Sequence, residues 1–347
     1  MNILSGISDF FGLNIGTKTI RMVQLKGSGT PKSLVRYAYV PVDVRISQSD
    51  SKTDQQKLAA IIADLVAKSG VSTKNVVVGI PAQRVFTTVV NMEKLPNNEL
   101  AKAIRFQVDS LIPTPVDESK YDWALLGDSP QDNTKVEVLL SSVTNSFVEK
   151  YLDLLEGIGL NVVAFEPDTM ALCRSLTAPG SKLPQVIINV GSRSTDLVIV
   201  VNEAPRLTRS IATGSEALIR SGAQNLNVDE KQAEQLIFKF GLAQGRLEGQ
   251  VYNAIISTVD TIVGEIDKSL KFFSSRYTGA QIDRLIVTGE ASRLPEFPAY
   301  LANKFNINVE IGNAWRNVAY DPSRQNELQT VSNQFGVAVG LAERNND

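Results

Sequence analysis

Hydrophobic residues recur along this chain with two different periods, which predicts a mixed α/β protein. A period of two, or a short unbroken apolar run, is typical of a strand, and a period of 3.6 is typical of a helix. In the first half this predicts a strand hairpin over 12–26, further strands over 34–41, 76–80, 85–90, 121–126, 136–143 and 161–165, and helices over 54–69, 97–111 and 146–158. Asn97 or Asn98 is expected to cap the helix 97–111.

The second half repeats this alternation after a linker over 177–184 that is rich in turn residues. After a second hairpin, strands are predicted over 284–288 and 309–311, and helices over 229–240, 250–277, 297–305 and 330–344. At the start of the chain one helical face carries apolar side chains, which leaves two interpretations, a short docking helix or a lead-in packed on the first sheet. These residues are Ile3, Leu4, Ile7, Phe10 and Phe11. No apolar run reaches the roughly 20 residues needed to cross a bilayer, so a soluble protein is expected.

One short segment of the chain occurs twice. Residues 13–23 align without a gap to residues 188–198, and the Asn, the Gly and the final Val of the two copies are identical. Each copy predicts a strand, a tight turn at the Gly and a second strand. A Gly permits a positive φ and close backbone approach, and the amides that follow it then point into one concavity that suits a phosphate. Two such hairpins facing each other across a cleft would hold the phosphates of a nucleotide from both sides.

Length and composition restrict the classes of function. At 347 residues the chain is long enough for two domains, which we predict over 1–182 and 183–347. Its net charge of −2 argues against a nucleic-acid-binding surface. It contains no histidine, which excludes histidine triads, histidine metal sites and histidine proton shuttles. Its single cysteine, Cys173, excludes an internal disulfide.

Duplicated phosphate hairpins on two α/β domains resemble the actin-like ATPase superfamily. Within this superfamily, residues 100–126 point to one family. They contain a helix that runs into an Ile-Pro-x-Pro motif and then an Asp-aromatic pair, and this resembles the signature of the PilM family of type IV pilus assembly. The matching residues are Ile104, Phe106, Ile112, Pro113, Pro115, Asp122 and Trp123. Further matches, in order between residues 11 and 344, lie at 228–234, 265–273, 287–295 and 335–342. A more distant resemblance is to the cell-division protein FtsA.

The resemblance implies an α/β, actin-like (ribonuclease H-like) fold of two domains with a cleft between them. As in FtsA, an inserted subdomain is expected in the first half, over 83–160. The second half is expected to hold a helical subdomain over 215–278, and the helix 330–344 is a candidate to pack back on the first domain. PilM-like proteins are cytoplasmic and lie at the inner face of the cytoplasmic membrane. They bind the cytoplasmic tail of the inner-membrane protein PilN and link it to the pilus motor ATPases, so they are peripheral to the membrane through partners. Self-association is a further option.

The superfamily binds ATP with Mg²⁺, so the resemblance also implies a nucleotide site. The residues it assigns to the cofactor are Asn14, Gly16, Thr17, Lys18, Asn189, Gly191, Ser192, Thr195, Asp196, Gly214, Glu234, Gly289 and Glu290. Asn14 and Asn189 would also contact the metal through water. Glu166 and Asp168 are candidates for positioning the lytic water, and the alternative is that they cap the following helix, 169–176.

Several of these positions depart from the superfamily pattern. The residue before x-Gly in each hairpin is usually Asp, and here it is Asn14 and Asn189, which carry no charge to hold Mg²⁺. The usual Gly-Gly of the base-binding turn is Gly289-Glu290, and Ile237 stands where a Lys is usual. Because phosphoryl transfer depends on electrostatics around the metal, these changes predict an inefficient ATPase or a pseudo-ATPase.

Alternatives remain open for single residues and for the function. Asp196 either completes a phosphate clamp or caps its hairpin, and Lys18 and Arg193 are either phosphate ligands or solvated charges. The leading hypothesis is an assembly scaffold that acts through a protein–protein contact. The alternatives are an actin-like ATPase whose cycle switches partner binding, an FtsA-like membrane-associated assembly protein, and a small-molecule kinase, for which the sequence offers no acceptor-binding segment.

Overall fold

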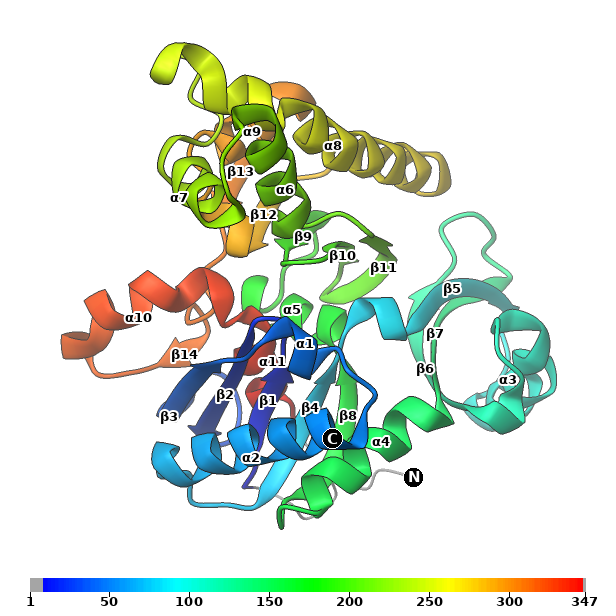
Figure 1. The fold of residues 1–347 in the computed structure, drawn as a ribbon. Coiled ribbons are helices and arrows are strands. Elements are labelled where there is room, and N and C mark those ends of the chain that lie inside the picture. Colours follow the sequence, from blue (N-terminus) through cyan, green and yellow to red (C-terminus); the bar gives the residue numbers. More distant parts are fainter. Residues whose placement is uncertain (1–8, 346–347) are drawn as a thin grey trace. The chain divides into compact units, whose positions relative to one another are not determined.

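The computed structural model describes residues 9–345, which form two compact units (Figure 1). The first unit comprises residues 9–171, 204–208 and 337–345, and the second comprises residues 172–203 and 209–336. The helical pattern from Ile3 to Phe11 lies mostly outside the described residues, and Phe11 is the first residue of a strand. In the described part of the chain, no helix is long and apolar enough to cross a membrane.

The main sheet of the first unit begins with the first predicted hairpin. Five of its strands are neighbours in the order β3-β2-β1-β4-β8. They are β1 (Phe11–Ile15), β2 (Thr19–Lys26), β3 (Lys32–Pro41), β4 (Asn75–Ile80) and β8 (Asn161–Pro167). The chain between β3 and β4 forms α1 (Val44–Ser47) and α2 (Lys52–Ser69), and α4 (Asn145–Glu156) precedes β8. The predicted strands and the helix 54–69 are confirmed, and α1 was not predicted.

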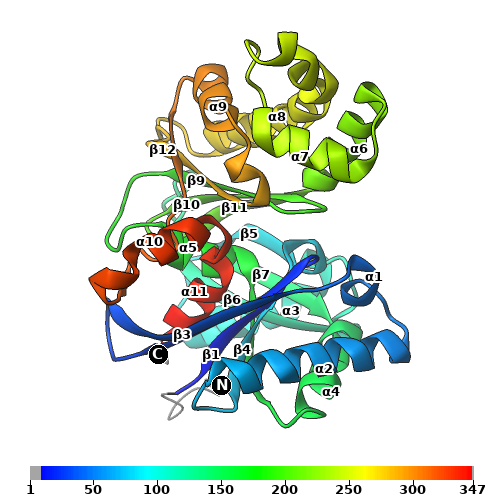
Figure 2. The ribbon, with the colours of Figure 1, turned by 60° about the vertical axis from the view of Figure 1, so that its left-hand side comes forward.

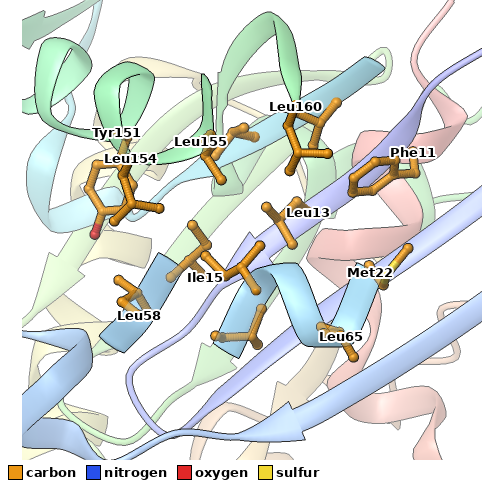
Figure 3. Packing of buried hydrophobic residues seen from close by; sticks show 14 of the residues in the cluster. Phe11, Leu13, Ile15, Met22, Leu58, Leu65, Tyr151, Leu154, Leu155 and Leu160 are labelled. Atoms are coloured by element: carbon orange, nitrogen blue, oxygen red, sulfur yellow. The ribbon is translucent and has the colours of Figure 1, made fainter. Parts of the chain in front are cut away.

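Apolar side chains between this sheet and two helices form a hydrophobic core within the first unit (Figure 3). On β1, Phe11, Leu13 and Ile15 alternate with Gly12 and Asn14, so the three apolar side chains share one face. They pack with residues of α2 and α4, namely Leu58, Leu65, Tyr151, Leu154 and Leu155. Burying one such leucine or phenylalanine contributes about 1.5–3 kcal/mol.

The opposite face of the same strands is covered by α11 (Gly336–Glu343). A β-carbon on Gly12 would lie 2.5 Å from the carbonyl oxygen of Ala338 and 2.7 Å from Cβ of Leu341. A β-carbon on Gly79 would lie 3.2 Å from Cδ1 of Leu341. Glycine at these two positions therefore allows the helix to approach the backbone of β1 and β4. A further helix, α5 (Asp168–Leu176), follows directly after β8 in the chain.

A three-stranded antiparallel sheet lies within the first unit, in the order β5-β7-β6. Its strands are β5 (Phe86–Glu93), β6 (Ser119–Asp128) and β7 (Lys135–Thr144), and α3 (Asn97–Leu111) packs on it. The helix 97–111 is confirmed, but the predicted cap is wrong. Pro96 occupies the N-cap position without a side-chain bond, and its carbonyl accepts from the amide of Leu100. Asn97 and Asn98 are therefore already inside the first turn.

The second unit contains a five-stranded sheet in the order β11-β10-β9-β12-β13. The strands are β9 (Gln185–Val190), β10 (Thr195–Val201), β11 (Ala204–Ile211), β12 (Arg284–Gly289) and β13 (Asn308–Ile311), and the short β14 (Val318–Ala319) follows. Four helices lie on the same side of the sheet in both views (Figures 1 and 2). They are α6 (Ser215–Leu226), α7 (Glu230–Phe240), α8 (Gln250–Arg276) and α9 (Phe297–Phe305).

The two sheets share one topology. In each, the first strand of the repeated hairpin pairs antiparallel with the strand that follows it and parallel with a strand reached by a crossover: β1 with β2 and β4, and β9 with β10 and β12. A further parallel strand, β8 or β13, then lies beside the crossover strand. The sequence repeat therefore marks two copies of the same α/β arrangement.

The predicted helix over 330–344 is wrong as a continuous element. The structure has α10 (Gln325–Val331), a turn at Ser332–Gln334, and then α11. Buried Asn333 holds the break, because its amide donates to Ser292 Oγ at 2.7 Å and to the Gly289 carbonyl at 3.2 Å. Its own carbonyl accepts from Thr288 Oγ1 at 2.7 Å. The apolar pattern could not predict this break, because it contains no sign that Asn333 bonds to Thr288, Gly289 and Ser292 instead of continuing a helix.

Candidate functional site

The first hairpin closes with a tight turn at Gly16. The amide of Gly16 donates to the carbonyl of Thr19 at 3.1 Å, and Asn14 pairs with Arg21 across the two strands. Asn14 is buried, with 8% of its surface exposed. Its Oδ1 and Nη1 of Arg21 lie 3.8 and 3.7 Å from the point that a β-carbon on Gly16 would occupy. The hairpin therefore places an amide and a guanidinium on the same side of the turn.

Arg21 is a candidate phosphate ligand that the sequence reasoning missed. The signal was available, because residues 14 and 21 face each other in any two-strand hairpin whose turn lies at 16–19. Guanidinium is well suited to phosphate because its N–H groups form a rigid fork that matches two oxygens.

The other turn residues of this hairpin are held through their backbone. The Thr17 carbonyl accepts from Ser47 Oγ at 2.6 Å, and the Lys18 carbonyl accepts from the amide of Val42 at 2.9 Å. The side chains of Thr17 and Lys18 are half-buried. The short helix α1, which contains Ser47, therefore fixes the conformation of the turn from outside the hairpin.

The second hairpin has the same geometry in its own unit. The amide of Gly191 donates to the Ser194 carbonyl at 2.9 Å, and Asn189 pairs with Asp196 across the strands. Neither Gly191 nor Gly16 has a positive φ, so that part of the expectation is wrong. Gly16 is required for close approach instead, because a β-carbon there would lie 2.7 Å from the Thr19 carbonyl.

The start of α6 packs on the turn of the second hairpin. The amides of Ser215 and Glu216 donate to the carbonyls of Gly191 and Ser192, each at 2.9 Å. Gly214 allows this contact, because a β-carbon on it would lie 2.5 Å from the Gly191 carbonyl. The side chain of Arg193 at the tip of the turn is exposed.

A carboxylate joins this hairpin to the end of β12. Oε2 of Glu290 accepts a hydrogen bond from Ser192 Oγ at 3.0 Å and from Ser215 Oγ at 2.7 Å. Glu290 follows Gly289, whose φ of 85° lies in the left-handed region. A β-carbon on Gly289 would lie 2.5 Å from Oδ1 of Asn189, so glycine is required there on both counts. The structure thus brings together Asn189, Ser192, Gly289 and Glu290 of the predicted set.

Asp196 and Thr195 continue the hairpin away from the turn. Thr195 Oγ1 donates to the Thr213 carbonyl at 2.8 Å, and Asp196 Oδ1 accepts from Ser210 Oγ at 2.6 Å. Burial raises the pKa of Asp196 to about 6, opposed by the hydrogen bonds from Ser210 and Ser194. The Asp196 carboxyl therefore titrates closer to neutral pH than an ordinary aspartate. The bond from Ser210 also fits the interpretation that Asp196 caps its hairpin.

Three predicted residues lie apart from the hairpin contacts. Glu234 is half-buried on α7, and the bonds that join Ser192, Ser215 and Glu290 do not involve it. Glu166 ends β8 and is buried, and its Oε2 accepts from Arg344 Nη1 at 2.9 Å.

Asp168 begins α5 rather than preceding it, and it lies against Gly79. Of the two acidic candidates, Glu166 is already held by its ion pair with Arg344, and this weakens the case that Glu166 positions a water.

The residues assigned to Mg²⁺ do not fit a directly held ion. Hard divalent cations favour carboxylate oxygens, and Asn14 and Asn189 offer neutral amides. Oδ1 of Asn189 is in addition packed against the backbone of Gly289. Within residues 9–345, no group of three or more histidine, cysteine, aspartate or glutamate side chains could hold a metal.

Comparisons with known proteins agree with this fold. Residues 12–346 match the family described as type IV pilus assembly protein PilM. The chain is 25% identical to a chain of a PilM–PilN type IV pilus biogenesis complex, with a TM-score of 0.81, over 96% of this chain and 97% of that one.

Two more distant structures share the fold. MreB5 of Spiroplasma citri bound to ADP is 12% identical, with a TM-score of 0.56, over 96% of this chain and 95% of that one. The ethanolamine utilization protein EutJ of Carboxydothermus hydrogenoformans is 14% identical, with a TM-score of 0.53, over 96% and 88%.

The duplicated sheets, the two matching hairpins and the inserted three-stranded sheet thus agree with a family match that covers nearly the whole chain. The fold is the mixed α/β actin-like ATPase fold, and the chain belongs to the PilM family of type IV pilus assembly proteins.

Proposed function

We propose that this protein is an assembly scaffold that binds the cytoplasmic tail of a PilN-like inner-membrane protein. The observation that carries the proposal is the similarity to a PilM–PilN complex at 25% identity over 96% of the chain. A partner that spans the membrane once would hold the scaffold at the inner face of the cytoplasmic membrane. The scaffold would then link that membrane protein to the pilus motor ATPases.

The three-stranded sheet and α3 are the part of the first unit where we expect the tail to bind. This part carries exposed apolar side chains: Phe86, Leu95, Phe106, Val116 and Leu125. Phe106 on α3 is 88% exposed, whereas its neighbour in the turn, Ile104, is buried. Exposed apolar groups of this kind are typical of protein-binding surfaces.

We propose further that ATP, if bound, acts as a ligand and is not hydrolysed efficiently. Asn14 and Asn189 supply no charge for Mg²⁺, and Glu166 is ion-paired with Arg344. The donor groups for phosphate are nevertheless present, with Arg21 beside the first turn and hydroxyls on the second. This combination supports a pseudo-ATPase scaffold over an ATPase switch.

Titration of the whole protein with a synthetic peptide of the PilN-like tail, encoded in the same genome, tests the scaffold. We expect saturable one-site binding by calorimetry, and slower hydrogen exchange within residues 83–160. A scrambled peptide of the same composition is the control. Equal heats for the two peptides, or protection confined to the second unit, would contradict the proposal.

A phosphate-release assay with ATP, with and without Mg²⁺, tests the second part. We expect release no faster than in buffer. Turnover that depends on Mg²⁺ would establish the alternative, an ATPase switch that still uses Asn14 and Asn189.

A further inference from the structure

Ser192 in the second hairpin and Ser215 at the start of α6 each have a side-chain hydroxyl that can donate to an anion. Their backbone groups are already engaged, because the Ser192 carbonyl accepts from Glu216 and the Ser215 amide donates to Gly191. Both hydroxyls donate to one atom, Oε2 of Glu290, at 3.0 and 2.7 Å. Two donors that converge on one anionic oxygen form a small anion site, and in this protein its occupant is a side chain of the same unit.

A carboxylate oxygen and a phosphate oxygen are the same kind of partner for a hydroxyl, since both are negatively charged acceptors. They cannot share the two donors, and a carboxylate beside a phosphate would add repulsion between like charges. A phosphate group can therefore use Ser192 and Ser215 only after the carboxylate of Glu290 has moved away.

The backbone before Glu290 is held in place. The Gly289 carbonyl accepts from Ser292 Oγ at 2.7 Å and from Asn333 Nδ2 at 3.2 Å, and both donors are buried. The φ of Gly289 is 85°, a conformation that other residues rarely adopt. Displacement of the carboxylate therefore has to occur by rotation of the Glu290 side chain rather than by movement of the loop.

We propose that Glu290 is an internal competitor for phosphate at the second hairpin. It fills the anion site in the unliganded protein, joins the hairpin, α6 and the end of β12, and lowers the affinity for any ligand with a phosphate group. The proposal rests on the nucleotide site of the proposed function and names how that site is restricted. It is independent of the binding of the PilN-like tail.

The test compares the wild-type protein with Glu290→Gln and Glu290→Gly by calorimetric titration with pyrophosphate and with ADP, both without Mg²⁺. Glu290→Gln keeps the size and removes the charge, and Glu290→Gly removes the whole side chain. We expect both ligands to bind at least about tenfold more tightly to the glycine variant than to the wild type, and the glutamine variant to lie between them. Circular dichroism verifies that each variant is folded.

Two further variants make the result specific. Glu230→Gln removes one negative charge from an exposed position of the same unit and should leave the affinity unchanged. Adding Ser192→Ala to Glu290→Gly should abolish the gain, because the phosphate then loses one of its two hydroxyl donors.

The outcomes separate this inference from the proposed function. Equal affinity of wild type and both Glu290 variants would overturn the competitor role and leave the nucleotide site standing. Binding to none of them would overturn both the competitor role and the nucleotide site. The scaffold role would then still be decided by the peptide titration.

Discussion

Replacing Asp196 by asparagine should stabilise the second unit above about pH 6 and leave its stability almost unchanged at pH 4. The carboxyl is buried, with 9% of the residue exposed, and accepts a hydrogen bond from Ser210. Asparagine is nearly the same size, and its Oδ1 can accept the same bond. The substitution therefore removes the titration and little else.

The magnitude follows from the pKa. Burial raises the pKa of Asp196 from 3.8 to about 6. Between these values the native protein holds a proton that the unfolded chain has released, so the free energy of unfolding falls as the pH rises through this window. One pKa unit corresponds to about 1.4 kcal/mol, so the charged carboxylate costs about 3 kcal/mol above pH 6. Below 3.8 the group is neutral in both states and the cost is absent.

Urea unfolding at a series of pH values from 4 to 8 measures this difference. Buried Trp315 reports on the second unit when Trp123, the other tryptophan, is replaced by phenylalanine in all variants. Asp196→Asn should gain about 3 kcal/mol relative to the parent at pH 8 and almost nothing at pH 4. Asp267→Asn, which removes an aspartate that is ion-paired with Lys271 on the surface of α8, is the matched control and should show no such window. A difference between Asp196→Asn and its parent that does not change with pH would refute the reasoning.

Two further substitutions test the packing by urea unfolding. Gly289→Ala should lower the free energy of unfolding by about 2 kcal/mol or more, because the new β-carbon meets Oδ1 of Asn189. Gly279→Ala, at a similar φ of 82° but with open space around it, should lower it by only about 1 kcal/mol. Equal losses for the two variants would contradict the close contact at Gly289. Ile104→Ala should cost about 2–5 kcal/mol and the exposed Phe106→Ala no more than about 0.5 kcal/mol, and the reverse order would show that α3 packs with its other face.

Much of the fold could be predicted from local pattern. The helix 97–111 was bounded correctly, because apolar residues recur at helical spacing and the flanking prolines limit it. Both hairpins were predicted because the repeat preserves the turn. The break at Ser332–Gln334 was not, since it depends on bonds from Asn333 to residues about 40 positions away. Those partners carry no local signal.

The sequence was sufficient to predict many residues of the candidate site, but not which of them contact one another. The sequence identified Glu290 as a departure from the usual Gly-Gly of the base-binding turn. That its carboxylate accepts from both Ser192 and Ser215 depends on three segments brought together by the fold. Arg21 could not be identified from the turn motif alone, because it lies on β2 at the strand position opposite Asn14.

The packing of α11 on β1 also bears on how the chain is made. The face of β1 that carries Gly12 is covered by residues more than 320 positions later, and Lys32 Nζ donates to the Arg344 carbonyl at 2.7 Å. Contacts of such separation form late, because the intervening chain has to be synthesised and the loop closed first. During translation the first unit therefore exposes an apolar sheet face until the second unit has left the ribosome. A nascent chain in that state is a natural client for a chaperone, and the first unit should complete its folding only after the second.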